Sequence, residues 1–124
     1  MGKVLGIGGV FFKTPDTVAV NAWYRRVLGF EMADWGGVVF PQQATGYQVW
    51  SPFKADTEYF DPSPHALMIN LIVDDLDAVL AKASAEGVEP LQRDDSDPSG
   101  RFAWVLDPVG IKLELWEPLQ DAST

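Results

Sequence analysis

Residues 107–118 read DPVGIKLELWEP, which is a tight turn followed by a strand. Asp107, Pro108 and Gly110 occupy the first, second and fourth positions of the turn, where a type I turn prefers these residue types. The residues from Lys112 to Trp116 then alternate in character, as in a strand that packs one face on a core. The stretch predicts strands at residues 102–106 and 112–116, joined by the turn.

The end of this stretch has a counterpart in the first half of the chain. Residues 48–52 (QVWSP) and 114–118 (ELWEP) share an apolar residue, a Trp, a variable residue and a Pro, in that order. Two expected helices repeat in the same way, because each has an Asp before it and a Gly after it, and the frames agree to within one residue. A duplicated module explains both matches. Chance similarity between short segments is the alternative.

The helices are expected between Asp16 and Gly29 and between Asp75 and Gly87, where Asp acts as an N-cap and Gly as a stop. Their apolar faces follow helical spacing and consist of Val20, Trp23, Tyr24, Val27 and Leu28, and of Leu76, Val79, Leu80 and Ala83. Strands are expected at residues 4–12, 30–33, 37–40 and 47–50, and at residues 66–73, 88–91, 102–106 and 112–116. One domain over residues 1–124 would then contain module one, at about residues 3–52, and module two, at about residues 64–118.

The composition limits the classes of partner. A chain of 124 residues with 47% hydrophobic content can bury one core. Its formal net charge of −9 disfavours nucleic acid and anionic membranes as partners, which leaves small molecules or other proteins, and a small-molecule ligand is the expected partner. The absence of Cys excludes disulfides, thiolate metal sites and a cysteine nucleophile. No apolar run approaches the roughly 18 residues of a membrane span and no targeting segment is evident, so we expect a cytoplasmic protein.

Three motifs together resemble the vicinal oxygen chelate superfamily, the group of glyoxalases, bleomycin resistance proteins and extradiol dioxygenases. They are Trp23-Tyr24 with Leu28-Gly29-Phe30, then Val73-Asp74-Asp75-Leu76, and last Asp107-Pro108-x-Gly110 before Leu113-Glu114-Leu115-Trp116-Glu117-Pro118. The resemblance covers nearly the whole chain. It implies an α+β fold of the glyoxalase/bleomycin resistance-like type, in which two βαβββ modules form a curved mixed sheet around a cleft. It also implies a homodimer.

The same resemblance implies a divalent metal in the cleft, held by the first and last strands of each module. The matching positions are Gly9 and Gln48 in module one and Met68 and Glu114 in module two. Gly9 has no side chain, a thioether suits soft metals, and only Glu114 offers a carboxylate. We therefore expect neither the family metal nor another cofactor. A divalent metal bound through a different set of ligands is the alternative.

Strand alternation predicts which side chains line the cleft. If Gln48 and Glu114 face inward, the neighbours that share their faces do so too. The expected ligand-binding residues are Phe11, Gln48, Trp50, Met68, Asn70, Lys112 and Trp116. Such a lining suits a flat apolar or aromatic ligand. In the alternative interpretation, the tryptophans fill the space that a metal and substrate occupy in relatives.

Two ionisable residues have open roles. Glu114 is a candidate general base on an aromatic-lined strand, or a structural partner of Lys112 or Arg101 in an ion pair. His65 is expected at the surface where a strand begins, facing away from the metal positions unless a bulge turns it. Residues 95–100 begin like a calcium loop but lack the closing Glu, so we interpret them as a solvated acidic turn.

These patterns favour a metal-free protein that binds a small molecule. The alternative is a lyase, isomerase or dioxygenase of the same superfamily, acting through a metal or through Glu114. A third possibility is a module that regulates a partner protein through an exposed apolar surface.

Overall fold

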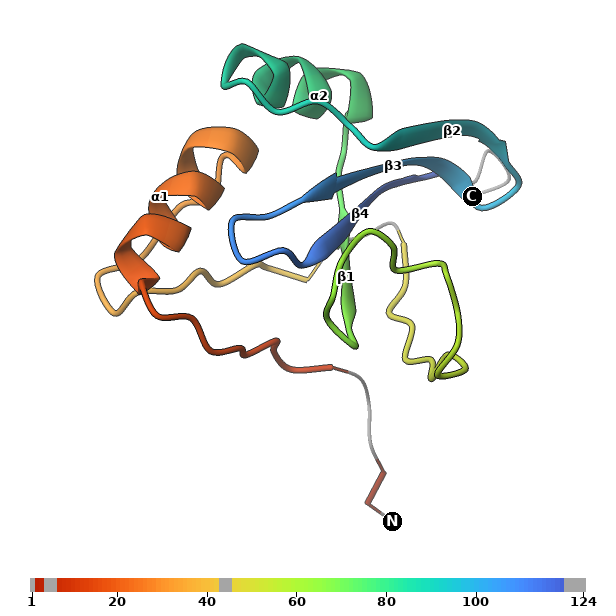
Figure 1. Ribbon diagram of the computed structural model, residues 1–124, viewed down its shortest axis with the longest axis horizontal. Helices are drawn as coiled ribbons and strands as arrows, with labels where there is room; N and C mark the ends of the chain where they lie inside the picture. The colour runs from red at the N-terminus through yellow and green to blue at the C-terminus, as the bar shows by residue number, and fades with distance from the viewer. Residues whose placement is uncertain (1, 4–6, 43–45, 120–124) are drawn as a thin grey trace.

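The computed structural model describes residues 2–3, 7–42 and 46–119 (Figure 1). It contains the helices α1 (Thr17–Leu28) and α2 (Leu76–Ala85) and the strands β1 (Met68–Ile72), β2 (Gln92–Asp97), β3 (Gly100–Leu106) and β4 (Lys112–Pro118). The strands form one mixed sheet in the order β1-β4-β3-β2. β1 and β4 are parallel, whereas β2, β3 and β4 pair antiparallel. The fold class is therefore α+β, as the sequence predicts.

Both helices begin where their capping residues predict. The Asp16 carboxylate accepts a hydrogen bond from the Ala19 backbone N at 2.9 Å, and the Asp75 carboxylate accepts one from the Ala78 backbone N at 3.1 Å. Each bond satisfies a backbone donor that the first turn leaves unpaired. α1 ends at Gly29, whose φ of 75° is the left-handed conformation that favours glycine. None of the helices in the described part of the chain is long and apolar enough to cross a membrane.

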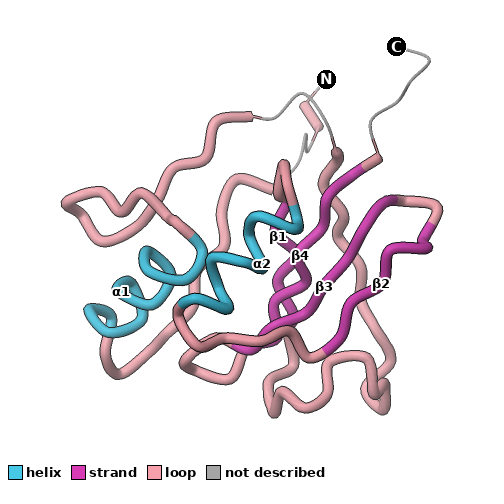
Figure 2. The backbone as a smooth tube through the Cα atoms, turned by 90° about the horizontal axis from the view of Figure 1, so that it is seen from above, coloured by secondary structure: helices cyan, strands magenta, loops and turns pink. Residues whose placement is uncertain are grey.

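Both helices and one face of the sheet share a single core (Figure 2). The sheet contributes alternate residues of β3 and β4, which are fully buried because strand side chains alternate between faces. The sheet residues in this core cluster include Ala103, Val105, Leu113 and Leu115, and its helix residues are Val20, Tyr24, Leu76 and Leu80. The connection at residues 51–65 lies on the side of the opposite sheet face, below the sheet in Figure 1.

A buried hydrogen bond joins α1 to the turn at residues 107–110. The Tyr24 hydroxyl donates to Asp107 Oδ2 at 2.6 Å, while Asp107 Oδ1 accepts from the backbone N atoms of Val109 and Ile111. Burial, followed by the neighbouring Asp107 carboxylate, raises the pKa of Tyr24 far above its ordinary value. Asp107 thus serves both as the first residue of the turn and as the anchor of the helix.

The second half forms the expected βαβββ order, with one shift. β1, β3 and β4 lie where they were predicted, but the strand expected at residues 88–91 is wrong, because β2 occupies Gln92–Asp97. Pairing begins at Leu91, whose backbone N donates to the Trp104 carbonyl. The segment interpreted as a solvated acidic turn is therefore strand up to Asp97. An edge strand tolerates such charge, because one edge and much of its surface face water.

The first half departs further from the prediction. Residues 4–6 lie outside the described part, and the other segments expected as strands, at residues 7–12, 30–33, 37–40 and 47–50, form no ladder pairing in the described structure. Module one therefore contributes α1 but no described strand to the sheet. Strand propensity becomes a strand only beside a partner backbone, and no described neighbour supplies one.

Candidate ligand-binding site

The face of the sheet opposite the helices carries the polar and aromatic side chains. Asn70 of β1 stands opposite Glu114 of β4, and Glu114 stands opposite Trp104 of β3. In the same register, Met68 pairs with Lys112 and Phe102 pairs with Trp116. Because strand neighbours in register point to the same side, these residues form one surface.

Glu114 is the centre of a hydrogen-bond network. Only 8% of the residue is exposed, and its two carboxylate oxygens accept three side-chain bonds. Asn70 Nδ2 donates to Oε1 at 2.8 Å, Trp104 Nε1 donates to Oε2 at 2.9 Å, and the Tyr59 hydroxyl also donates to Oε2. These donors occupy most of the acceptor positions of a carboxylate.

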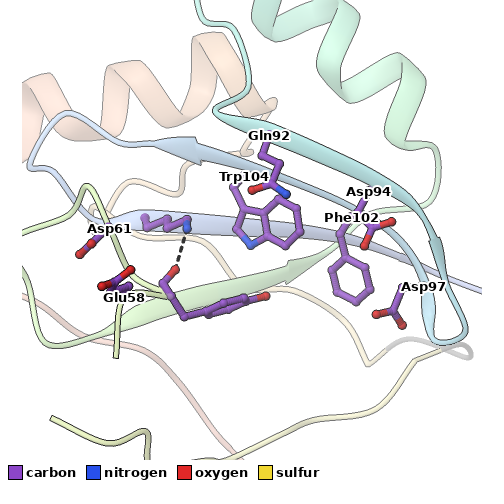
Figure 3. A pocket seen from close by; sticks show the side chains of 9 residues that line it. Glu58, Asp61, Gln92, Asp94, Asp97, Phe102 and Trp104 are labelled. Carbon is purple, nitrogen blue, oxygen red and sulfur yellow. Dashed lines mark hydrogen bonds between the residues drawn. The ribbon is translucent and has the colours of Figure 1, made fainter. Parts of the chain in front are cut away.

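Tyr59 fastens the connection at residues 51–65 to the sheet. Besides its bond to Glu114, its carbonyl accepts from Lys112 Nζ at 2.6 Å, the dashed line in Figure 3. The same ammonium lies 5.3 Å from the centre of the Tyr59 ring and 5.8 Å from that of the Trp104 ring. Burial, followed by the hydrogen bond to Glu114, raises the pKa of the Tyr59 hydroxyl, so it remains a proton donor at neutral pH.

Three aromatic rings form a parallel row beside this network. Phe102 stacks against Trp104, with ring centres 6.0 Å apart and planes 13° apart, and against Trp116, at 6.1 Å and 8°. Trp116 is fixed further by Tyr47, whose ring meets it edge-on at 5.0 Å, and by its indole bond to the Ser99 carbonyl. Phe102 is half-buried, whereas both tryptophans are buried. The row is a flat and rigid apolar surface.

A pocket of about 430 Å³ opens over part of this surface (Figure 3). Its size lies within the range of small-molecule sites. Aromatic side chains come from β3 and Tyr59, and acidic side chains come from β2 and residues 58–61. The lining consists of Glu58, Tyr59, Asp61, Gln92, Asp94, Asp97, Phe102, Trp104 and Lys112.

The structure brings only some of the expected ligand-binding residues to this place. Lys112 lines the pocket, while Met68, Asn70 and Trp116 share its sheet face without lining it. Three residues from the first half lie elsewhere, because their segments do not join the sheet. Phe11 is 92% exposed, Trp50 is 81% exposed, and Gln48 uses its amide oxygen to accept from the Ile7 backbone N at 2.5 Å.

The pocket also contains residues that sequence reasoning missed. Phe102 and Trp104 carried a usable signal, because they alternate along the strand next to Glu114 and Trp116 and so must share their face. No comparable signal in the sequence pointed to Tyr59, Glu58 and Asp61, because they lie in an irregular connection where side chains do not alternate with a regular period. Asp94 and Asp97 were placed in or beside a turn rather than on an inward strand face.

The ion pairs proposed for Glu114 are not formed. Arg101 binds Glu117, Asp77 and Asp95 instead, and Lys112 donates to the Tyr59 carbonyl. Neutral donors from Tyr59, Asn70 and Trp104 hold Glu114 in place in the described structure.

His65 lies in the bend before β1 and is exposed, in agreement with the favoured interpretation of the sequence. Its ring Nε2 lies 2.7 Å from the Val109 carbonyl oxygen, and its backbone N donates to the Ser63 hydroxyl. His65 therefore connects the entry of β1 to the turn at residues 107–110, and it does not line the pocket.

The four positions that match the family metal site do not fit a metal. Gly9 has no side chain, Gln48 is bonded to Ile7, and Met68 offers a thioether. Glu114 has its oxygens directed at three protein donors. Within residues 2–3, 7–42 and 46–119, no three His, Cys, Asp or Glu side chains are grouped so that they could hold a metal ion.

Comparison with known proteins agrees with this architecture. Residues 9–116 match the family model described as a glyoxalase-like domain. The glyoxalase / bleomycin resistance protein from Catenulispora acidiphila DSM 44928 is 28% identical, with 84% of this chain and 90% of that chain covered and a TM-score of 0.45. TnmS3, an antibiotic binding protein from Streptomyces sp. CB03234, is 24% identical, with 84% and 88% covered and a TM-score of 0.52. A protein from the mobile metagenome of V. pseudocholerae is 16% identical, with 95% and 100% covered and a TM-score of 0.56. No curated protein matches the chain.

Proposed function

This chain belongs to the glyoxalase-like family of the vicinal oxygen chelate superfamily, and from this premise we propose that it binds an aromatic small molecule without the help of a metal. The fold alone does not choose a function, because one fold hosts many sites. The observation that carries the proposal is the pocket of about 430 Å³ beside the stacked rings of Phe102 and Trp104. A planar ligand would lie against the exposed part of the half-buried Phe102, which is the accessible member of the row.

The state of Glu114 supports binding over catalysis. A general base needs a free acceptor position within reach of the substrate proton. Glu114 does not line the pocket, and its oxygens accept bonds from Tyr59, Asn70 and Trp104. We assign it the positioning of these three side chains. The same bonds engage the oxygens that a metal would need, which supports a proposal without a metal cofactor.

Binding can be tested with 2-naphthalenemethanol, a neutral bicyclic aromatic compound, as the ligand. Each indole N–H gives a separate NMR signal, and the Trp104 signal is identified by its loss in Trp104→Phe. We expect this signal to move on titration, whereas the signal of Trp35, which is 69% exposed and outside the pocket, should stay in place. If the Trp35 signal moved and the Trp104 signal did not, the compound would bind elsewhere and the pocket assignment would be wrong.

The metal is tested separately. Elemental analysis of protein purified without a metal-affinity tag should find far less than one equivalent of Zn, Ni, Mn or Fe. Calorimetric titration with the same ions should show no stoichiometric binding. Tight binding that disappears in Glu114→Ala would return the chain to the metal-dependent branch of the superfamily.

We also propose a homodimer and a cytoplasmic location, both of which the sequence predicts. Support for the dimer comes from the first half, where extended segments leave large apolar side chains in water. Phe11, Val39 and Trp50 are 92%, 76% and 81% exposed, so these side chains are available to a partner subunit. Light scattering coupled to gel filtration should give twice the mass of the chain, and Trp50→Lys should shift the protein towards the monomer. A monomeric wild type would refute the dimer but not the pocket.

A further inference from the structure

The charges of β2 are sorted between its two sides. On the side away from the pocket, Arg93 binds Asp77 at 2.7 Å and Asp95 at 2.9 Å. Arg101 of β3 joins the same cluster through Asp77 at 2.9 Å. The guanidinium groups of Arg93 and Arg101 therefore form their ion pairs on the outer side of the strand, where they neutralise Asp77 and Asp95.

The carboxylates on the pocket side have no such partners. Asp94 lines the pocket because it alternates with Arg93 and Asp95, and Asp97 reaches the same side after a register shift between the two. Glu58 and Asp61 of the connection line the other end of the pocket (Figure 3). Within the part of the chain that the structure describes, none of these four carboxylates takes part in an ion pair.

Local hydrogen bonds keep β2's pocket carboxylates in place without cancelling their charge. Asp94 Oδ1 accepts from the Ser96 backbone N at 2.8 Å and from the Ser96 hydroxyl at 2.7 Å. These bonds lower the pKa of Asp94, so it is ionised at neutral pH. Asp97 Oδ1 accepts from the Ser99 backbone N at 2.7 Å. Both side chains are thus fixed anions on one wall of the pocket.

The one cation of the lining, Lys112, is already engaged. It is 9% exposed, its ammonium donates to the Tyr59 carbonyl, and it lies over the rings of Tyr59 and Trp104. The lining therefore combines four carboxylates and one ammonium with the aromatic side chains of Tyr59, Phe102 and Trp104. These carboxylates are not a metal site, because the described residues hold no group of ligands arranged for a metal.

We infer that the pocket takes a planar aromatic compound that carries a protonated amine. The ring would lie against the exposed part of Phe102, and the ammonium would lie against Asp94 and Asp97. Partly exposed charge pairs are each weak and are screened by salt, but several fixed carboxylates act together on one cation. An anionic aromatic compound would meet only repulsion there. The inference rests on the proposed binding function and names the chemical class of its ligand.

Three compounds with one ring system isolate the charge: 2-naphthylmethylamine, 2-naphthalenemethanol and 2-naphthoate. By calorimetry at low salt, we expect the amine to bind about tenfold more tightly than the alcohol, and the carboxylate to bind at least about tenfold more weakly than the alcohol. Salt at about 0.5 M should remove most of the advantage of the amine and leave the affinity of the alcohol unchanged.

Variants locate the effect. The double variant Asp94→Asn, Asp97→Asn keeps the acceptor oxygens that bind Ser96 and Ser99, and it should bring the amine to within about threefold of the alcohol. Asp95→Asn is the matched control, because this residue lies on the outer side of the same strand, and it should keep the preference. Unfolding curves of both variants would confirm that each is folded.

The outcomes separate the inference from the proposed function. Equal affinity for amine and alcohol, with the Trp104 signal moving for both, would overturn the inference and leave aromatic binding intact. A preference for the amine that survives in the double variant would also overturn it, as would stoichiometric Ca²⁺ binding lost in that variant. If none of the three compounds moves the Trp104 signal, the proposed function fails and the inference fails with it.

Discussion

Replacing Tyr59 with Phe removes one hydroxyl from the centre of the site and leaves its ring. The hydroxyl donates to Glu114, whereas the ring stacks on Phe53, with centres 5.6 Å apart and planes 13° apart, and supports the ammonium of Lys112. The carbonyl that accepts from Lys112 belongs to the backbone and also survives. The variant therefore isolates one bond between the connection and the sheet.

The expected cost follows from the environment of that bond. A hydrogen bond to a charged group contributes about 1.5–3 kcal/mol to folding stability. Tyr59 is 41% exposed, so water can partly replace the lost donor, and Trp104 and Asn70 still donate to Glu114. We expect the free energy of unfolding to fall by about 1–1.5 kcal/mol, at or just below the low end of that range. Since Tyr59 is one wall of the pocket, affinity for the naphthyl amine should fall by about threefold to tenfold.

Urea unfolding followed by tryptophan emission measures the first effect, and calorimetry measures the second. Tyr47→Phe is the control, because Tyr47 is 61% exposed and touches Trp116 through its ring, so its loss of stability should stay below about 0.5 kcal/mol. A cost for Tyr59→Phe equal to that of Tyr47→Phe would show that the bond to Glu114 does not hold the connection. Unchanged ligand affinity in a destabilised Tyr59→Phe would show that the connection is not a wall of the binding site.

Three further predictions concern the scaffold. Burial and Asp107 raise the pKa of Tyr24 above the ordinary value of about 10, so the stability that this residue contributes is complete below pH 10 and is lost as the pH rises towards the folded pKa. Above pH 10, Tyr24 should lower the free energy of unfolding by about 1.4 kcal/mol per pH unit, and Tyr24→Phe should remove that slope. Gly100→Ala should cost at least about 1–3 kcal/mol in urea unfolding, because φ is 140° and the new Cβ would lie 2.3 Å from the Glu117 carbonyl oxygen; Gly87→Ala, at positive φ in open space, should cost less. Leu113→Ala should cost about 2–5 kcal/mol, because this side chain is fully buried, and a loss under about 1 kcal/mol would contradict the core assignment.

The helices could be predicted from the sequence because their determinants are local. Asp16 and Asp75 each cap a backbone N–H three residues ahead, which requires no knowledge of the rest of the chain. The core faces were equally readable, since Val20 and Tyr24 in one helix and Leu76 and Leu80 in the other keep helical spacing. One detail differs, because α2 ends at Ala85 with Glu86 as its C-cap, and Gly87 follows the cap.

The strands were predictable only where a partner strand stands beside them. β4 lies in the centre of the second-half sheet, and its prediction from residues 112–116 is confirmed. Residues 47–50 carry an equivalent motif and yet form no described strand, because no described backbone pairs with them. The prediction was wrong in the opposite way for β2, which is a strand although the sequence did not predict one there. Asp94 and Asp95 look like a loop in the sequence, but the adjacent β3 supplies the ladder hydrogen bonds.

The pocket was half predictable. The face of β4 that carries Lys112 and Glu114 follows from alternation, and the structure places both there. The opposite wall depends on Tyr59, which lies 55 residues from Glu114 in the chain and is brought to it by the fold alone. No local sequence pattern predicts such a contact, because it depends on the path of a long connection and on a buried acceptor.

The hydrogen bonds of Glu114 show how a buried carboxylate can be held by neutral protein donors. A buried carboxylate is costly unless its charge is stabilised by a metal, an ion pair or several hydrogen bonds. At this position the neighbours supply the third solution, since Asn70, Trp104 and Tyr59 each donate to it. A metal would have to displace at least one of these donors, and the loss of Tyr59 would open the wall of the pocket. The network that stabilises Glu114 is therefore the same network that shapes the pocket, which is why we expect metal binding and aromatic binding to exclude each other in this chain.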